Sequence, residues 1–379
     1  MGIFMFKELA ALFRFLLKTP KEEKKIIFYS EHGGYWPYLG SFAEELVDKH
    51  KQPLCYVTSD PNHPILQTTK PLIKSFYLNK LLPLFMILIK SKVFVLTLTD
   101  LNQFHLKRSI NSVHYVYVFH SLVSTHMVYR YGAFDYYDSI LCFGQHQIEE
   151  IRKHEEINKL PAKKLIEVGY PRVERIYAAY NKYLLERKEP LKKTILVAPS
   201  WGAANILESC GEQLTEILLE ANYEVIVRPH PETIKHFPEL MTLFVSKFGS
   251  NPNFKLELSV ATDDSLLQAD VLITDYSGIL FEYSFGTERP VLSLDVPPKV
   301  NNLQFKELNI EPLELSLRSK LGVVVSPEDL KNVPEEIIKL IERKEYYKKH
   351  IQELRKQHIF SFGHSSEIGA QYIFDLLKN

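Results

Sequence analysis

The chain has 379 residues, which is too long for one ordinary hydrophobic core and fits two domains. Nearly half of the residues are apolar (45%), which excludes a disordered or low-complexity protein. Lysine plus arginine and aspartate plus glutamate number 46 each, so the chain lacks the basic excess that a protein wrapping duplex nucleic acid needs. Composition therefore favours a two-domain globular protein with no nucleic-acid partner.

Residues 1–25 predict an amphipathic N-terminal helix. An apolar stripe recurs at helical spacing and comprises Phe6, Leu9, Ala10, Phe13, Leu16 and Leu17. Lys7, Arg14 and Lys18 fall on another face. This pattern favours contact of residues 3–25 with an inner membrane surface, and the alternative is a helix docked on its own domain. No apolar run reaches the roughly 18 residues that a spanning helix needs, so we expect a cytoplasmic protein, peripheral on the cytoplasmic face of a bacterial plasma membrane.

From residue 26 onward, apolar strand candidates alternate with helical stretches, which is typical of parallel sheets with crossover helices. The first set of strands is Ile26–Ser30, Leu54–Ser59, Val93–Thr99, Val113–Phe119, Ile140–Phe143 and Leu165–Val168. The segment from Tyr177 to Lys193 is polar and has no strand character. We therefore place an N-terminal, acceptor-binding Rossmann-like domain at residues 26–178.

A second set of strands then begins and predicts a C-terminal, nucleotide-donor Rossmann-like domain at residues 190–365. These strands are Thr194–Pro199, Tyr223–Arg228, Phe254–Leu258, Val271–Thr274 and Val291–Leu294. Glu335–Ile341 and Glu345–Lys356 are predicted helices. A final helix, within residues 366–379, is predicted to pack back on the N-terminal domain. The fold class is therefore α/β, with two doubly wound domains facing a central cleft and ligands at the carboxyl ends of the strands.

A phosphate site is predicted where one buried strand ends in Asp275-Tyr276-Ser277-Gly278 and a helix begins at once. The free N–H groups of the helix, the Ser277 hydroxyl and the small Gly278 suit an anion. Glu282, one turn into the helix, is a candidate for holding a nucleotide hydroxyl. A simple helix cap by Asp275 or Ser277 is the structural alternative.

Three further strand ends carry candidate residues. Arg228-Pro-His230-Pro offers a guanidinium fork and an imidazole on a loop stiffened by two prolines. His120, followed by Ser121, ends an apolar strand and is a candidate general base, with a satisfied core histidine as the alternative. Gly33-Gly34 leaves room for an acceptor, and Pro199-Ser200 opens the second domain at the expected position of the nucleotide.

The sequence gives no sign of a metal site or a cofactor. None of the 14 histidines lies in an HExxH pattern, and the three cysteines lack CxxC spacing. We therefore expect no metal, no cofactor and reduced, unpaired thiols.

In this order, the clusters resemble the CDP-glycerol glycerophosphotransferase family, which builds teichoic-acid and related polymers. The resemblance runs from about residue 26 to the C-terminus. Its most specific elements are Arg228-Pro-His-Pro231, Thr274-Asp-Tyr-Ser277 with Leu280-Phe-Glu282, and Gly363-His-Ser-Ser-Glu367. It implies a GT-B-like fold and a CDP-linked alcohol as donor substrate. It also implies that His120 and His230 are the catalytic pair and that Asp275 and Ser277 belong to the donor-phosphate loop.

The chain departs from the family pattern at three places. Ser121-Leu122 stands where the family has Gly-Thr after its first histidine, and Gly278 replaces a second serine in the phosphate loop. Phe362-Gly363-His364 replaces an Asp-Gly-Lys stretch. Neither histidine is lost.

The resemblance predicts transfer of a polyol phosphate, glycerol phosphate above all, from a CDP-alcohol to a hydroxyl of a glycan or lipid-linked acceptor, with release of CMP. Arg228, His230 and the Ser277 loop would stabilise the phosphoryl charge, and His120 would take the proton. The alternatives are a nucleotide-sugar glycosyltransferase of capsule or lipopolysaccharide synthesis, a nucleotide-sugar 2-epimerase, and a catalytically silent homologue that binds a membrane or a partner.

Overall fold

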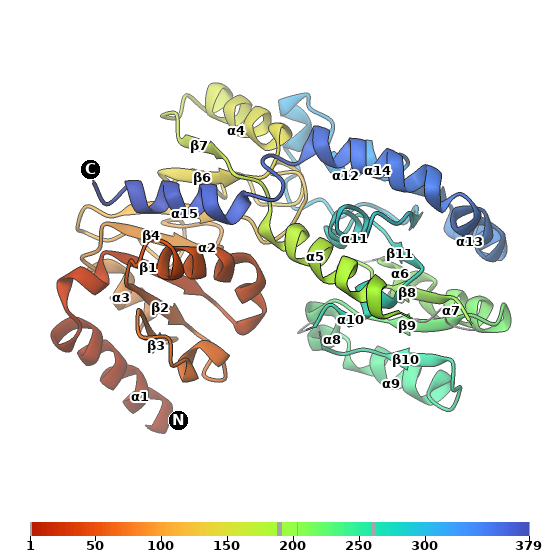
Figure 1. Cartoon of the computed structure of the whole chain (residues 1–379), viewed down its shortest axis with the longest axis horizontal. Helices are drawn as coiled ribbons and strands as arrows, with labels where there is room; N and C mark the ends of the chain where they lie inside the picture. Colours follow the sequence, from red (N-terminus) through yellow and green to blue (C-terminus); the bar gives the residue numbers. More distant parts are fainter. Residues whose placement is uncertain (1, 188–191, 203, 260–261, 379) are drawn as a thin grey trace. The chain divides into compact units, whose positions relative to one another are not determined.

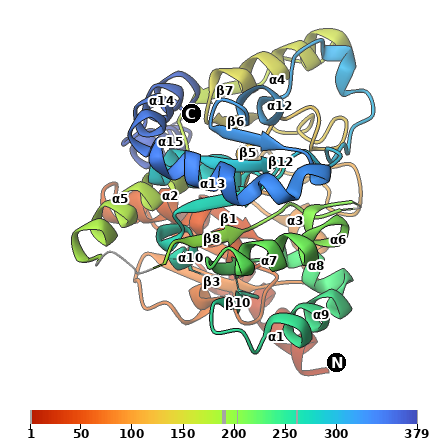
Figure 2. The ribbon, with the colours of Figure 1, turned by 90° about the vertical axis from the view of Figure 1, so that its right-hand side faces the viewer.

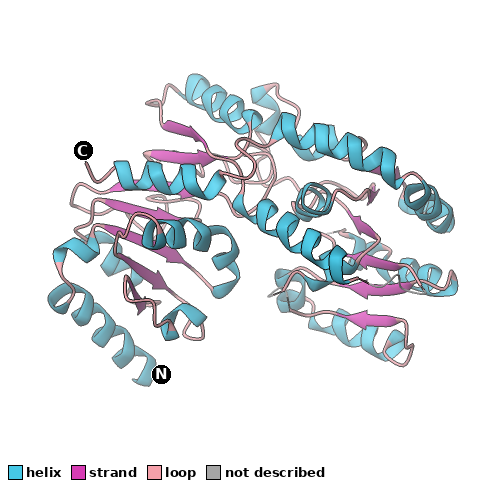
Figure 3. Ribbon diagram, viewed as in Figure 1, coloured by secondary structure: helices cyan, strands magenta, loops and turns pink. Residues whose placement is uncertain are grey.

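The computed structural model describes residues 2–187, 192–202, 204–259 and 262–378. The chain forms two compact units. Unit 1 comprises residues 1–120, 129–171 and 358–379, and unit 2 comprises residues 121–128 and 172–357. The predicted start of the second domain, residue 190, lies outside the described residues. Each unit is an α/β body with one parallel sheet, coloured magenta in Figure 3, and helices around it.

The sheet of unit 1 has the strand order β3-β2-β1-β4-β5-β6-β7 and is parallel throughout (Figure 1). Its strands are β1 (Ile26–Ser30), β2 (Leu54–Thr58), β3 (Ile73–Tyr77), β4 (Val93–Leu96), β5 (His114–Val118), β6 (Ser139–Cys142) and β7 (Lys164–Glu167). The order reverses between β1 and β4, where Ile26 pairs with Val93 and Tyr29 with Leu96. Ligands of doubly wound sheets bind outside the strand ends at such a reversal.

The helices of unit 1 are α1 (Gly2–Phe13), α2 (Trp36–Asp48), α3 (Leu82–Leu88), α4 (Gln145–Asn158) and α15 (Ser365–Asp375). The C-terminal α15 packs on α2, and both contribute to the apolar core over the β1 face of the sheet. Gly369 of α15 permits this close approach, because an added Cβ would lie 2.3 Å from the Phe42 ring.

The sheet of unit 2 has the order β10-β9-β8-β11-β12-β13, so its order reverses between β8 and β11. Its strands are β8 (Thr194–Val197), β9 (Glu224–Val227), β10 (Phe254–Leu256), β11 (Val271–Thr274), β12 (Val291–Leu294) and β13 (Gly322–Val325). The helices are α5 (Pro171–Glu186), α6 (Ile206–Ser209), α7 (Gly211–Glu220), α8 (Pro231–His236), α9 (Pro238–Phe248), α10 (Asp264–Gln268), α11 (Ile279–Thr287), α12 (Leu313–Leu317), α13 (Val333–Glu342) and α14 (Lys344–His358). Figure 2 shows α9 beside the edge strand β10, with which it is in contact.

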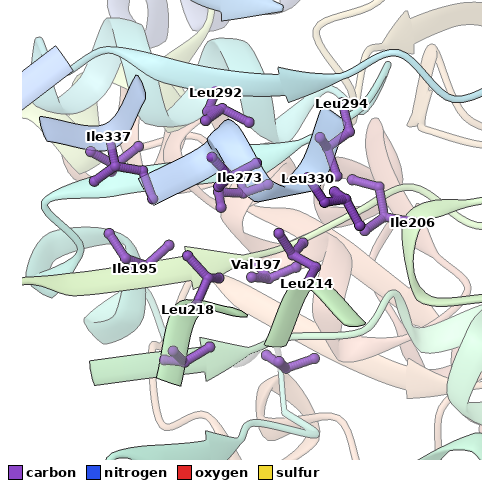
Figure 4. Packing of buried hydrophobic residues seen from close by; sticks show 14 of the residues in the cluster. Ile195, Val197, Ile206, Leu214, Leu218, Ile273, Leu292, Leu294, Leu330 and Ile337 are labelled. Carbon is purple, nitrogen blue, oxygen red and sulfur yellow. The ribbon is translucent and has the colours of Figure 1, made fainter. Parts of the chain in front are cut away.

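One apolar core fixes the strand ends of unit 2. Ile195, Val197 and Ile273 extend from the central strands β8 and β11. They pack with Leu214 of α7 and Ile337 of α13 (Figure 4). Because β8 and β11 are buried on both faces, their runs are almost wholly apolar, as expected for central parallel strands.

The predicted strands are confirmed, and their ends agree within three residues. Two strands were not predicted. In β3, Ile73 and Phe76 are buried while the residues between them are partly exposed, so the strand has no continuous apolar run. In β13, the sequence begins with Gly322, which the pairing requires, since a Cβ there would lie 1.7 Å from the Val291 carbonyl oxygen.

The segment from Tyr177 to Lys193 contains no strand among its described residues, and α5 continues through its first part to Glu186. Tyr180 and Tyr183 lie on this helix, and Arg289 stacks on Tyr180 at 4.6 Å. Helical periodicity, rather than a strand pattern, is the signal in this polar segment.

The N-terminal segment is α1, followed by a π-helical segment, Arg14–Lys18, and a 3₁₀-helical segment, Lys21–Lys24. Its docked face carries Leu12 and Phe15, with Phe15 in edge-on contact with Phe76 and Phe85. Glu8 on the same face accepts hydrogen bonds from the backbone N–H groups of Asn79 and Leu81. Within the described residues, no helix is both long enough and apolar enough to cross a bilayer.

Candidate active site

In unit 1, the predicted acceptor residues Gly33, Gly34 and His120 follow β1 and β5, at the carboxyl ends of the sheet. The backbone N–H of Gly33 donates to Asp60 Oδ2 (3.1 Å), and that of Gly34 donates to His32 Nδ1 (3.1 Å). The His32 ring stacks on Tyr35 at 4.2 Å. Side-chain acceptors therefore hold the glycine loop in place, and the loop lies near the point where the strand order reverses.

His120 lies among aromatic rings at this edge. Tyr35 meets it edge-on with ring centroids 5.0 Å apart, and Tyr38 and Tyr129 follow at 6.3 Å each. Within the described part of the chain, Nδ1 of His120 is buried and has no hydrogen-bond partner. Burial and, to a smaller extent, the nearby His32 lower the pKa of His120, a hydrogen bond to the Thr97 backbone opposes them, and the resulting pKa is about 4. The imidazole is therefore neutral near pH 7 and able to accept a proton.

In unit 2, Asp275 and Ser200 lie on either side of the reversal between β8 and β11. The Asp275 carboxylate is 1% exposed. It accepts hydrogen bonds from the Ser200 backbone N–H (2.9 Å) and hydroxyl (3.0 Å). Burial raises the pKa of Asp275, and the hydrogen bonds from Ser200 oppose that rise. Asp275 therefore ties the two predicted donor loops together, and Pro199, also buried, precedes the tied residue.

The phosphate loop continues through Ser277 and Gly278 into α11. Gly278 is the residue that caps α11, and no side chain caps this helix. Ser121 packs directly on the loop, because a Cβ on Gly278 would lie 2.3 Å from Ser121 Oγ. The structure thus brings Ser121, predicted on the acceptor side, beside the predicted donor-phosphate loop.

Ser121 belongs to the segment Ser121–Val128, which is bound to unit 2 by buried hydrogen bonds. Ser124 donates from its backbone N–H (2.8 Å) and its hydroxyl (2.7 Å) to the carboxylate of Glu314, which is fully buried. Asn302 donates to the His126 carbonyl oxygen at 2.8 Å. The chain therefore enters unit 2 immediately after His120.

Tyr276 is buried, and its hydroxyl donates to Asp295 (2.9 Å). Arg318 lies over the Tyr276 ring at 4.4 Å and pairs with Asp295 at 2.6 Å. Burial raises the pKa of Tyr276 to about 12. Tyr276 therefore anchors the phosphate loop to Asp295 and Arg318.

His230 caps the short helix α8. Its Nδ1 accepts from the Glu232 backbone N–H (3.1 Å), which leaves the proton of the neutral ring on Nε2. The Trp201 ring lies 6.0 Å from the His230 ring and 6.4 Å from that of His236. The imidazole is thereby fixed in orientation with Nε2 as the donor nitrogen.

Arg228 and Glu282 have protein partners that the sequence did not predict. Arg228 is 4% exposed, donates to Ser265 at 3.2 Å and lies 3.8 Å from the Glu257 carboxylate. Glu282 is also 4% exposed and accepts from Arg172 Nε at 2.9 Å. Both side chains therefore brace the loops from inside unit 2, and neither presents an open charged group.

Lys299 was not predicted from the sequence. It lies in the loop after β12, and its Nζ is 3.3 Å from the centre of the Trp201 ring. Two prolines, Pro297 and Pro298, precede it and stiffen this loop, just as Pro229 and Pro231 stiffen the loop around His230. That repeated pattern of prolines beside a polar residue after a buried strand is the signal by which Lys299 could have been found.

Among the residues that the structure describes, no group of three or more histidine, cysteine, aspartate or glutamate side chains is placed to hold a metal ion. The three cysteines are unpaired thiols.

The last motif of the resemblance, Gly363–Glu367, leads into α15. The sequence Ser365-Ser366-Glu367 before a helix is typical of a capping box, but His364 is the capping position and makes no side-chain cap. Ser365 is instead buried, since Gly169 leaves space for its Oγ.

The chain matches the family model for CDP-glycerol:poly(glycerophosphate) glycerophosphotransferase over residues 11–296. No curated protein sequence matches it. The structure of the wall teichoic acid polymerase TagF is similar in fold, with a TM-score of 0.62 at 16% identity, covering 100% of this chain and 99% of the other.

Two epimerase structures are also similar. The putative UDP-N-acetylglucosamine 2-epimerase of Listeria monocytogenes has a TM-score of 0.58 at 11% identity, covering 94% of this chain and 96% of the other. The UDP-GlcNAc 2-epimerase of Neisseria meningitidis has a TM-score of 0.59 at 14% identity, covering 94% and 100%. These likenesses place the fold in the GT-B-like class, as the sequence predicted.

Proposed function

The chain belongs to the CDP-glycerol:poly(glycerophosphate) glycerophosphotransferase family, and on that premise we propose that it transfers glycerol phosphate from CDP-glycerol to a hydroxyl of a cell-envelope glycan or lipid-linked acceptor. The acceptor oxygen forms a bond to the distal phosphorus of the donor. The bond from that phosphorus to the bridging oxygen breaks, CMP leaves with the electron pair, and the acceptor proton passes to a base.

One observation carries this proposal. The family match spans residues 11–296 and so includes His120, His230 and the loop Asp275–Gly278. These are the residues whose order along the chain predicted the reaction.

The properties of His120 support its role as the general base. Its pKa of about 4 keeps the ring neutral at physiological pH, and Nδ1 is buried without a partner in the described structure. A neutral imidazole can accept the acceptor proton while the surrounding rings of Tyr35 and Tyr38 limit water.

On the donor side, His230, Ser277 and the N-terminal end of α11 are proposed to bind the phosphoryl oxygens. The fixed Nε2 proton of His230 suits a donor to an anionic oxygen, and the helix dipole favours negative charge at its N-terminus. Asp275 positions Ser200, while Arg228 and Glu282 hold the loops in place rather than touching phosphate.

We also propose that α1 attaches the protein to the cytoplasmic face of the membrane, where a lipid-linked acceptor would be found. The exposed face of α1 and of the following segment Arg14–Lys18 carries large apolar side chains: Phe6 (75%), Leu9 (52%), Phe13 (52%) and Leu17 (70%). Exposed Lys7, Lys18 and Lys21 lie near this face. Apolar anchors flanked by lysines suit an anionic bilayer surface.

The direct test uses purified protein with CDP-glycerol, CDP-ribitol or nucleotide sugars and a membrane extract as acceptor. We expect release of CMP from CDP-glycerol and incorporation of labelled glycerol phosphate. His230→Ala should abolish most of this release, while His105→Ala, at an exposed histidine, should leave it intact. Release of a nucleoside diphosphate from a sugar donor would instead identify a glycosyltransferase, and conversion of UDP-N-acetylglucosamine without transfer would identify an epimerase.

A further inference from the structure

A diphosphate donor brings negative charge to unit 2, yet the arginines near the predicted donor loops are already engaged. Arg172 pairs with Glu282 (2.9 Å) and Asp263 (2.7 Å). Arg228 lies against Ser265 and Glu257, and Arg318 pairs with Asp295. Withdrawing a buried cation from its carboxylate is strongly unfavourable, because it leaves an uncompensated buried charge. Arg172 and Arg228, whose side chains are buried beside their carboxylate partners, are therefore poor candidates for meeting the donor.

Lys299 differs from them. Among the described residues, it has no ion pair with a carboxylate, and its ammonium group lies instead over the Trp201 ring. The Trp201 ring also adjoins His230 and His236. A lysine ammonium group held over an aromatic ring can leave the ring and pair with an anion, which attracts it more strongly.

Gly202, which follows Trp201, also lies beside the Lys299 side chain. Gly202 has φ of +120°, a conformation that side-chain-bearing residues rarely adopt, and a Cβ there would lie 3.8 Å from the Lys299 side chain. The preceding residue Ser200 is tied to Asp275 by two hydrogen bonds. Lys299, Trp201 and the phosphate loop are thus linked through one short segment after β8.

The charges facing Lys299 come from two elements besides its own loop. Glu232 of α8 and Asp275 after β11 attract the ammonium, while burial opposes its charge and lowers the pKa of Lys299 to about 8. Neither carboxylate is within ion-pair distance in the described structure. The two carboxylates therefore offset only part of the free-energy cost of burying the Lys299 charge, and a bound anion would offset more of it.

We infer that Lys299 binds the donor diphosphate, supplying on unit 2 the positive charge that the sequence alone assigned to Arg228. This inference rests on the proposed function for the identity of the donor. Its chemical core, a diphosphate-binding lysine released from Trp201, does not depend on which group is transferred.

The test measures binding to the full chain by isothermal titration calorimetry, without acceptor, using CDP-glycerol, CDP and inorganic pyrophosphate. Lys299→Ala is expected to raise the Kd for all three about tenfold or more, the usual scale for losing one charge-assisted contact. Lys299→Arg should restore most of the affinity. Lys320→Ala, at an exposed lysine of the same unit, serves as the matched control and should bind like the wild type.

Two further measurements separate direct binding from a structural role. In wild-type protein, affinity for CDP-glycerol should fall as pH rises through about 8, because Lys299 loses its proton there, whereas Lys299→Arg should show no such fall. Tryptophan fluorescence should change on donor binding in the wild type and change less in Lys299→Ala, since the ammonium leaves the Trp201 face.

The outcomes distinguish this inference from the proposed function. Wild-type Kd values in Lys299→Ala would overturn the inference even if CMP is released from CDP-glycerol. If no CDP-alcohol is turned over, but pyrophosphate and CDP bind in a Lys299-dependent way, the inference stands and the proposed function fails. Absence of CDP and pyrophosphate binding to the wild type would overturn the inference as well.

Discussion

The neutral state of His120 is a consequence of its surroundings rather than of its residue type. An ordinary histidine has a pKa near 6.5, and burial lowers that of His120 to about 4. A ring that is neutral throughout the physiological range carries one nitrogen lone pair that can accept a proton at the start of a reaction.

Replacement of His120 by alanine is expected to lower kcat for CMP release by roughly 10²–10⁴-fold, the usual range for a lost general base. In the wild type, the protonation of His120 should not reduce kcat/KM as pH falls from 8 to about 5, because the group gains its proton only near pH 4. A pH–rate profile from pH 5 to 9 checks this. An acid limb centred near 6.5 that disappears in His120→Ala would contradict the assignment of its pKa.

At the scale of elements, the start of α11 depends on the segment that follows His120. Gly278 and Ser121 are in such close contact that the glycine is required by its neighbour rather than by its backbone angle, since φ is −58°. The departure from the family pattern at residue 278 is thus coupled to the departure at residue 121.

Gly278→Ala is therefore expected to destabilise unit 2 by about 1–3 kcal/mol, the typical cost of overpacking, and to lower turnover. The matched double variant Gly278→Ala/Ser121→Ala should recover part of both losses. The 2.3 Å clash with Ser121 Oγ is then removed, and the added Cβ meets the residue 121 Cβ at 3.5 Å and the Leu122 backbone nitrogen at a tight 3.2 Å. Urea unfolding and CMP release measure the two effects. Additive losses in the double variant would show that the two positions do not compete for space.

The exposed and the buried side chains of the N-terminal segment, which comprises α1 and Arg14–Lys18, lead to separate predictions about membrane binding and folding. Phe6→Ser/Leu17→Ser changes only exposed side chains and is expected to reduce flotation with anionic liposomes while leaving the unfolding transition in place. Phe15→Ala removes a buried ring and is expected to cost about 3–5 kcal/mol of stability in unit 1. Unchanged liposome binding in the exposed-face variant would remove the case for membrane contact through α1.

At the scale of the whole molecule, neither unit is one continuous piece of chain. Unit 1 consists of residues 1–120 together with the later segments 129–171 and 358–379. Unit 2 consists of residues 172–357 together with the earlier segment 121–128. The last segment is part of a core, since Ala370 and Ile373 of α15 pack with Leu39 and Phe42 of α2. The stability of unit 1 therefore depends on both ends of the sequence.

Truncation after His358 should destabilise unit 1 selectively, because it uncovers the apolar face of α2. Hydrogen exchange followed by mass spectrometry should show faster exchange in β1 and β2, with β8 and β11 still protected. Equal loss of protection in both sheets would mean that the units do not unfold separately.

The sequence by itself determined the elements whose pattern is local. Central strands such as Val271–Thr274 and Val291–Leu294 were predicted to the residue, because burial on both faces leaves a mostly apolar run. The positions of His120, His230 and the Asp275 loop at strand ends followed from the same runs. The family itself followed from the order of these short motifs.

Only the tertiary structure decided where charged side chains point. The sequence predicts that Arg228 binds phosphate, but in the structure its guanidinium group contacts Ser265 and Glu257. The lysine that lies over the Trp201 ring, Lys299, was not predicted. Ser121 likewise lies against Gly278 of the donor loop, and its neighbour Ser124 is held by Glu314, 190 residues later in the chain. These outcomes depend on packing between elements far apart in sequence, because burial and partner choice set the charge and direction of a side chain, and neither leaves a periodic local signal.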